Sequence, residues 1–363
     1  MRLDTTRRGL AARRTAIRAL TALATALSLA TLTAACGGSA PGEGAQAGQS
    51  GSIKITIGAG DNIMDLPMKV AEANGYFRKQ GLQVTFVQTN ASTGPAALES
   101  GSVQFLNSSP TGFLSALAKD VPQVAVAADG LGNPIAIVVS KKFADANKIT
   151  SSSPMEQVVK ALGTSIGGAS SANTKAQASQ FLQARGVDPA KVKWVQLPSP
   201  AANKAALNSG QIDWFMTGQP TPLSIEQAGE GLVVADPLRV PEWSPERAGY
   251  GEFVVARKDY LEKNPEIAKK VVAAIQEATA YMNAHVDDPA LAELAAKAME
   301  GTSAPVLQAT LKQVGWPTSV AMDEATWKKT LDFVNGLGVL TKAMTVTAET
   351  DWTNKYVQPG GGS

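Results

Sequence analysis

Short polar segments at predicted strand ends contain the side chains of this chain that are best suited to hold a small molecule. Their hydroxyl and amide groups can donate hydrogen bonds, and free backbone N–H groups at a helix start can hold an oxyanion. Three such helix starts aimed at one cleft would suit a sulfonate, carboxylate, phosphate or nitrate without a formal cation. The expected ligand contacts are Asn62, Thr89, Ser92, Thr93, Asn107, Ser108, Ser109, Thr111, Ser170, Ser171, Asn173, Thr174, Thr217, Gln219 and Trp243.

Each of these segments also has a purely structural alternative. A Ser, Thr, Asn or Asp that precedes a helix commonly caps it, and we expect Asp61 to be such a cap, which leaves Asn62 for a ligand. Residues 89–94 would also fit a polar surface turn. Trp214 lies within a predicted strand and is expected in the core, whereas Trp243 lies in a loop where stacking on a ligand and simple packing are both open.

The counts of metal-binding and nucleophilic residues exclude much of enzyme chemistry. The 363 residues include one Cys, Cys36, and one His, His285, so neither an internal disulfide nor a zinc site built from several Cys or His can form. The glycine-rich segment 163–168 lacks the Lys-Ser/Thr pair of a phosphate-binding P-loop. No motif pairs a Ser with a base, so we expect no enzyme activity, no cofactor and no bound metal. An enzyme that acts on a small anion or a pyrimidine is the alternative of another class.

The distribution of charge excludes two kinds of partner. The formal net charge is +2, but the first 35 residues contain six Arg and a single acid, and the remainder carries 27 basic and 30 acidic residues. Residues 36–363 therefore carry no excess of positive charge that would attract nucleic acid or an anionic membrane surface.

The amino terminus has the form of a secretory signal. Residues 1–35 combine an Arg-rich start with an uncharged apolar run and small residues before a cut. Cys36 follows, and residues 32–36 resemble a bacterial lipobox, in which the Cys is lipidated; a soluble secreted protein with an incidental Cys is the alternative. Residues 36–52 have the composition of a flexible tether. We therefore expect an exported protein held by lipid on the outer face of the cytoplasmic membrane.

The leader is compatible with either the general secretory route or the twin-arginine route. Arg7 and Arg8 fit a twin-arginine signal, but pairs of Arg are frequent in any basic leader.

Strands and helices alternate over the first two thirds of the body, which favours parallel pairing with right-handed crossovers. The last third is mostly helical. The predicted strands are 53–57, 82–87, 103–106, 164–167, 192–195 and 212–216, and the clearest helices are 175–185, 201–208, 265–285 and 289–299.

An internal echo indicates two similar lobes. Residues 96–111 and 205–221 both read as a short helix closed by Ser-Gly, then a strand, then a polar loop that reaches Pro-Thr. Ligands of open α/β sheets bind at the carboxyl ends of strands. Two lobes that aim such loops at each other define a cleft.

Three segments carry a resemblance to a known family. Residues 71–84 (AEANGYFRKQGLQV), the Ala-Leu-x-Ser-Gly segments of the echo and residues 254–266 resemble the substrate-binding proteins of ABC importers for sulfonates, taurine, nitrate and thiamine precursors. The resemblance spans about 53–357. The motif in 71–84 is specific for this superfamily but says little about the ligand.

The resemblance implies an α/β fold of the periplasmic-binding-protein type II. Each of two lobes would be a mixed, mainly parallel sheet flanked by helices, with residues 53–138 and 252–363 in one lobe, 139–251 in the other, and two crossing strands between them. Such a protein closes around one small molecule and delivers it to the transmembrane permease subunits of an ABC importer.

The ligand implied is small, and its identity is open. An organosulfonate or similar oxyanion is preferred, and nitrate or a pyrimidine related to thiamine precursors is the alternative. The protein is expected to be a monomer that meets the membrane only through its lipid anchor.

Overall fold

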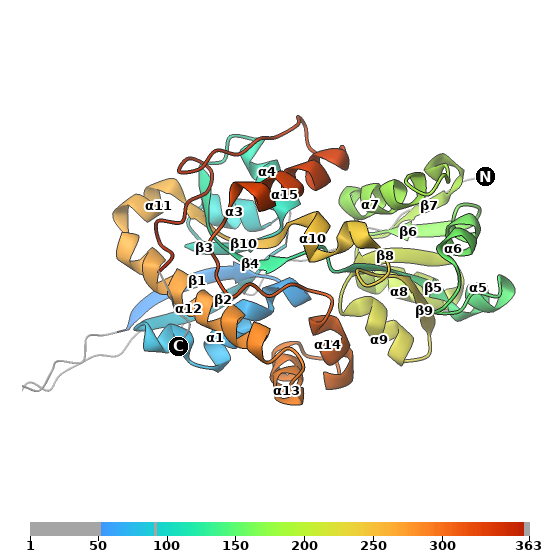
Figure 1. The fold of residues 1–363 in the computed structure, drawn as a ribbon, viewed down its shortest axis with the longest axis horizontal. Coiled ribbons are helices and arrows are strands. Elements are labelled where there is room, and N and C mark those ends of the chain that lie inside the picture. The colour runs from blue at the N-terminus through green and yellow to red at the C-terminus, as the bar shows by residue number, and fades with distance from the viewer. Residues whose placement is uncertain (1–51, 91–92, 359–363) are drawn as a thin grey trace, which may run out of the picture. The chain divides into compact units, whose positions relative to one another are not determined.

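The computed structural model describes residues 52–90 and 93–358, which form two lobes that are each built on a five-stranded sheet flanked by helices (Figure 1). The predicted leader, Cys36, nearly all of the tether and Ser92 lie outside the described residues. Within the described part of the chain, no helix has the length and apolar character needed to cross a bilayer.

The first sheet combines parallel and antiparallel pairs. Its β1 strand pairs in parallel with β2 and β3, and β10 returns antiparallel between β3 and β4. The strand order is β2 (Leu82–Gln88), β1 (Ile53–Ala59), β3 (Phe105–Ser108), β10 (Tyr250–Arg257) and β4 (Gln123–Leu131).

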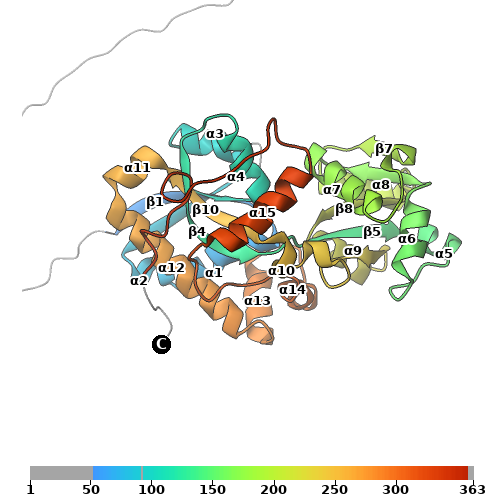
Figure 2. The ribbon, with the colours of Figure 1, turned by 45° about the horizontal axis from the view of Figure 1, so that its top comes forward.

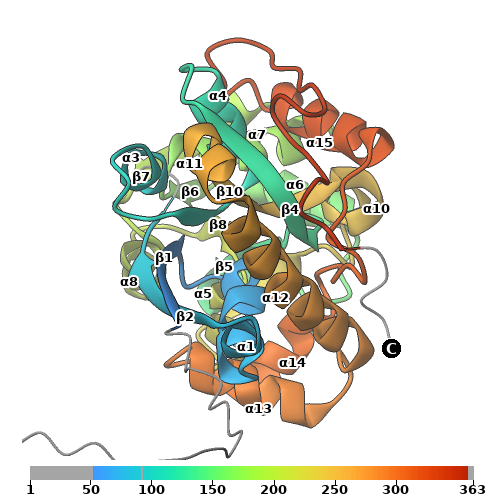
Figure 3. The ribbon, with the colours of Figure 1, turned by 90° about the vertical axis from the view of Figure 1, so that its left-hand side faces the viewer.

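Helices of this lobe come from both ends of the described chain. Figure 3 shows α12 lying across the first sheet with α1 beside it. They are α1 (Leu66–Ala73), α2 (Tyr76–Lys79), α3 (Gly94–Glu99), α4 (Pro110–Leu117), α11 (Lys258–Lys263), α12 (Pro265–Ala284), α13 (Pro289–Ala298), α14 (Ala304–Leu311) and α15 (Glu324–Gly336).

The second sheet repeats this pattern with a different set of strands. Its β6 strand pairs in parallel with β7 and β8, and β5 pairs antiparallel with β8 and β9. The order is β7 (Lys193–Gln196), β6 (Ile166–Ala169), β8 (Trp214–Gly218), β5 (Ile135–Ser140) and β9 (Gly231–Ala235).

The second lobe has its own helices and a separate core. Trp214 is fully buried there, as expected from the sequence. The helices are α5 (Lys141–Ala146), α6 (Met155–Leu162), α7 (Ala172–Gln183), α8 (Pro200–Ser209), α9 (Thr221–Gln227) and α10 (Pro245–Ala248), with short 3₁₀ turns η2 (Pro189–Lys191) and η3 (Pro241–Trp243); the first lobe has η1 (Ile63–Asp65).

The edge strand β4 is covered by the C-terminal part of the chain. The amide of Ala125 donates to Asp351 O and that of Ala128 to Val320 O, both at 2.9 Å. An exposed strand edge invites pairing with other chains, so this coverage explains why almost all of β4 is buried.

Helix α15 links the first lobe to the second. Figure 2 shows α15 extending from the first lobe toward α7. Its Phe333 packs against hydrophobic residues of both lobes, so the lobes contact each other outside the chain passages as well.

The internal echo has a structural counterpart. Residues 96–111 cover α3, β3 and the start of α4, and residues 205–221 cover the end of α8, then β8 and the start of α9. Strands β3 and β8 are each third in the order of their sheet. The helices α4 and α9, which begin at the Pro-Thr ends of the echo, were not among the helices expected from the sequence.

The chain passes between the sheets at two places. Residues 132–134 separate β4 from β5, and Gly249 directly precedes β10. Because β5 pairs only within the second sheet, Ile135 to Val138 belong with that sheet. We propose lobe boundaries at 132–134 and at Gly249, in place of residues 138 and 251.

The two passages approach each other closely. The amide of Gly132 donates to Gly249 O at 2.8 Å. A Cβ added to Gly251 would lie 2.3 Å from Gly132 O, and one added to Gly249 would lie 2.4 Å from Oγ1 of Thr330. Gly249 also has a φ of +77°, a conformation that favours glycine. Both its conformation and its surroundings therefore require a residue without a side chain.

We expect Gly249→Ala to lower the free energy of unfolding by about 3 kcal/mol, because backbone strain and overpacking add. Gly229 is the matched control, since its φ is +70° but nothing lies within 4 Å of an added Cβ. Gly229→Ala should therefore cost only about 1 kcal/mol. Urea denaturation measures both, and equal losses would contradict the steric account.

Candidate functional site

Two neighbouring cavities lie between the lobes, and together they form one cleft. The first has a volume of about 270 Å³ and the second about 480 Å³. Both are lined by elements of each lobe. They share the lining residues Asn62, Ser109, Gly218, Gln219 and Glu252.

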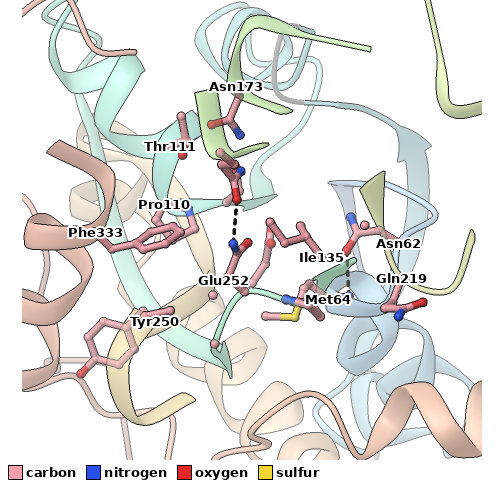
Figure 4. Close-up of a pocket in the computed structure, with 18 of the residues that line it drawn as sticks. Asn62, Met64, Pro110, Thr111, Ile135, Asn173, Gln219, Tyr250, Glu252 and Phe333 are labelled. Carbon is pink, nitrogen blue, oxygen red and sulfur yellow. Dashed lines mark hydrogen bonds between the residues drawn. The ribbon is translucent and has the colours of Figure 1, made fainter. Parts of the chain in front are cut away.

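The first cavity combines polar and apolar walls, and Figure 4 shows the side chains that line it. The start of α4 and the start of α7 contribute polar groups from opposite lobes. The apolar part comes from Met64, Pro110, Ile135 and Phe333, with the ring of Tyr250 beside them.

The second cavity is lined by the strand ends of the echo. Asn107 and Ser108 end β3, while Thr217 and Gly218 end β8. Thr89 lines the same cavity after β2. The two loops that the sequence predicted to face one cleft thus line a common cavity.

Two helices begin at the first cavity, and a serine side chain caps the N-terminus of each. Ser109 caps α4, where its Oγ accepts from the amide of Gly112 at 3.2 Å. Ser171 caps α7 in a capping box with Thr174. Helix N-termini carry partial positive charge and unpaired N–H groups, so this part of the cavity is suited to an anionic group.

Some lining groups have no partner among the described residues. Oδ1 of Asn173 in the first cavity and Oδ1 of Asn107 in the second are buried without a hydrogen bond. A buried polar atom without a partner is costly. These atoms are therefore candidates for ligand contacts.

Asn62 has the capping role that was expected of its neighbour. Its Oδ1 accepts from the amide of Met64 at 2.8 Å, and its Nδ2 donates to Asp65. Asp61 is exposed and pairs with Lys69 at 2.7 Å. The prediction of Asp61 as the cap is therefore wrong, because the turn η1 begins one residue later; Asn62 both caps it and lines the cleft.

Several predicted contacts lie away from the two cavities. Thr93 is exposed at the start of α3, and the Ser171 side chain serves its capping box. Ser170 lines neither cavity. Trp243 is buried against Phe181, with 5.3 Å between ring centroids, in the core of the second lobe.

Three carboxyl groups lie buried behind and within the cleft. Asp129 on β4 is fully buried and neither of its carboxyl oxygens has a hydrogen-bond partner in the described chain. Asp65 accepts from the amide of Gly60 at 2.8 Å and from Asn107 at 3.3 Å. Glu252 on β10 is 5% exposed and lines both cavities.

The pKa values of all three carboxyl groups are raised. Burial is the main cause, since water solvates a carboxylate better than the protein interior does. Asp65 raises the pKa of the other two further, and Asp129 raises that of Glu252. The charged form is therefore disfavoured at this position.

Several lining residues were not identified from the sequence. One signal was present: Glu252 precedes the apolar run 253–256 of a strand, where a charged residue is unusual. The missed residues include Met64, Asn133, Gln177, Glu252 and Phe333.

Replacing Asp129 by Asn should increase stability at neutral pH. Because its folded pKa is raised above 3.8, the folded protein holds a proton that the unfolded chain has released, and stability falls as pH rises from about 4. The fall ends above the folded pKa, where both states are ionised and the whole penalty of the buried charge is present. Asp129→Asn removes this penalty and should therefore be more stable than the wild type at pH 7.

Urea denaturation between pH 4 and pH 8 measures this difference. The variant should show a shallower decline of stability with pH than the wild type. Asp145 is exposed, so Asp145→Asn is the control and should change stability by less than about 0.5 kcal/mol. A loss of stability in Asp129→Asn at pH 7 would contradict the buried-charge account.

Solved structures share this fold at low sequence identity. A protein of Bordetella bronchiseptica RB50 is 23% identical with a TM-score of 0.63, covering 84% of this chain and 95% of its own. The periplasmic aliphatic sulphonate binding protein SsuA of Escherichia coli is 19% identical with a TM-score of 0.62, covering 81% and 90%. The periplasmic nitrate-binding protein NrtA of Synechocystis PCC 6803 is 16% identical with a TM-score of 0.56, covering 71% and 68%.

Sequence comparison gives the family. No curated protein matches the chain. The family described as NMT1/THI5 like matches residues 62–288, more than half of the 363 residues. This span begins at the cleft residue Asn62, contains the whole second lobe and ends just after α12. The chain therefore belongs to the NMT1/THI5-like family.

Proposed function

We propose that this protein is the solute-binding component of an ABC importer, and that it captures a small molecule with an oxyanion group in the cleft between its lobes. The observation that carries the proposal is that polar strand ends and helix starts of both lobes line one cleft. Because a ligand there contacts both lobes, the closed form gains contacts that an open form lacks.

The fold supports this proposal by analogy. SsuA and NrtA, which share the fold, are described as periplasmic sulphonate-binding and nitrate-binding proteins. Delivery to a transmembrane permease would follow from that role. Nitrate and pyrimidines related to thiamine precursors are the alternatives that a ligand screen must include.

A binding role also fits the residues better than catalysis does. Among the residues that the structure describes, no Cys or His lines either cavity. The only His, His285, caps the end of α12 and stacks on Tyr281. The cleft therefore offers donors and acceptors for binding, without a nucleophile paired with a base.

A thermal-shift screen over sulfonates, nitrate, carboxylates and pyrimidines tests the function. At one hundred times the Kd, a ligand adds about 2.7 kcal/mol of stability, which raises the melting temperature by about 5 °C. The absence of a shift with every compound would overturn the proposal. Native mass spectrometry of the purified protein would reveal a co-purified solute directly.

A variant locates the site. Thr111→Val keeps the size of the side chain and removes its hydroxyl from the first cavity, so we expect the affinity for the screened ligand to fall about tenfold. Thr164 is exposed and lines neither cavity, so Thr164→Val should bind as the wild type does. Calorimetric titration measures both, and equal affinities of the two variants would argue against the α4 start as a ligand contact.

We also propose export and lipid anchoring through Cys36. Cys36→Ala should release the protein from the cells into the medium, because the acylated sulfur would be its membrane attachment. Immunoblots of cell and medium fractions measure the distribution. Retention of the variant on the cells would contradict the anchor, and a conservative change in the tether, Ser39→Ala, is the control that should stay with the cells.

A further inference from the structure

We propose that Glu252 selects a ligand that carries a protonated nitrogen, so that the bound solute pairs a cationic group with this carboxylate. The inference rests on the proposed function, since it concerns the solute of the same cleft. It narrows the ligand from any small oxyanion to a zwitterion, which carries a protonated nitrogen in addition to its anionic group.

The position of Glu252 supports this role. It is one of five residues that line both cavities, and 95% of its surface is buried. No hydrogen bond or ion pair to its carboxylate is found within residues 52–90 and 93–358. Figure 4 shows Glu252 among the labelled side chains of the first cavity. A group in this position meets the ligand or stays without a partner.

The surroundings supply no cation of their own. Neither Lys nor Arg lines either cavity in the described chain. The titratable neighbours are Asp65 on η1 and Asp129 on β4, and both raise the pKa of Glu252. Lys69 is occupied by an ion pair with the exposed Asp61. A positive charge beside Glu252 must therefore come from the ligand.

A simple anion fits this arrangement poorly. A nitrate or an alkanesulfonate that lacks a positive group offers the Glu252 carboxylate no counter-charge, so its binding would repel an ionised Glu252 or require Glu252 to take up a proton. The starts of α4 and α7 line the first cavity together with Glu252 and suit an anionic end. A small zwitterion would satisfy both, with its anionic end at the helix starts and its ammonium at Glu252.

A metal ion is a less suitable occupant than an organic cation. Across the described ranges, no group of three His, Cys, Asp or Glu side chains converges to hold a metal ion. An ammonium or amidinium group needs one carboxylate and a few further acceptors. Oδ1 of Asn107, which has no hydrogen-bond partner among the described residues and lines the second cavity together with Glu252, is such an acceptor.

Matched pairs of solutes test the inference. Calorimetric titration compares 2-aminoethanesulfonate with ethanesulfonate, 3-aminopropanoate with propanoate, and further pairs of C2–C8 acids with and without an amine, alongside propylamine. We expect the amine-bearing members to bind the wild type at least about thirtyfold more tightly than their partners.

Two glutamate variants test whether the preference for amine-bearing solutes depends on Glu252. Glu252→Gln should reduce that preference to less than about threefold, and its melting temperature should equal or exceed that of the wild type, because an unpaired buried carboxyl is removed. Glu293 is exposed on α13 and lines neither cavity. Glu293→Gln makes the same change of charge and should keep the full preference.

The outcomes separate the two proposals. Plain anions that bind as tightly as their amine partners would overturn the inference and leave the proposed function intact. An unchanged preference in Glu252→Gln would overturn the role of this residue. If no solute of either kind binds, the proposed function fails, and the inference fails with it.

Discussion

The two backbone passages between the lobes meet so closely that no side chain fits between them. The amide N–H of Gly132 donates a hydrogen bond to Gly249 O, and Gly251 lies so close to the Gly132 carbonyl that a Cβ on Gly251 would clash with it. This contact brings β4 and β10 side by side in the first sheet. It thereby fixes Asp129 and Glu252 at the base of the cleft, and it leaves a short hinge on which closure of the lobes would depend.

The cleft itself combines two opposing electrostatic features. The starts of α4 and α7 present N–H groups and hydroxyls, which attract negative charge. Glu252 contributes a carboxylate with no cation beside it in the described structure, and Asp65 and Asp129 reinforce its preference for a proton or a positive partner. Such a site selects ligands by the positions of their charges, since an anionic group suits the helix starts but not Glu252, and a cationic group suits Glu252 but not the helix starts.

Prediction from the sequence succeeded where the signal was local. The alternation of Ile53 to Ile57 and the echo of 96–111 in 205–221 both appear as expected in the sheets. The prediction of the cap before the first helical turn was wrong by one residue, because Asn62 rather than Asp61 caps η1. Prediction from the sequence also missed α4, because Pro110 and Thr111 read as a polar loop although Pro is well suited to a first helical turn.

The sequence alone determined the α/β class, the duplicated helix–strand–loop unit and the absence of chemistry that needs several Cys or His, because these follow from composition and short-range periodicity. The tertiary structure decided which polar residues share the cleft. Asn62, Asn173, Gln219 and Glu252 are far apart along the chain, and they line a common cavity only because two sheets and two chain passages bring them together. The burial of Glu252, and with it the charge preference of the site, depends on these long-range contacts, which no local pattern encodes.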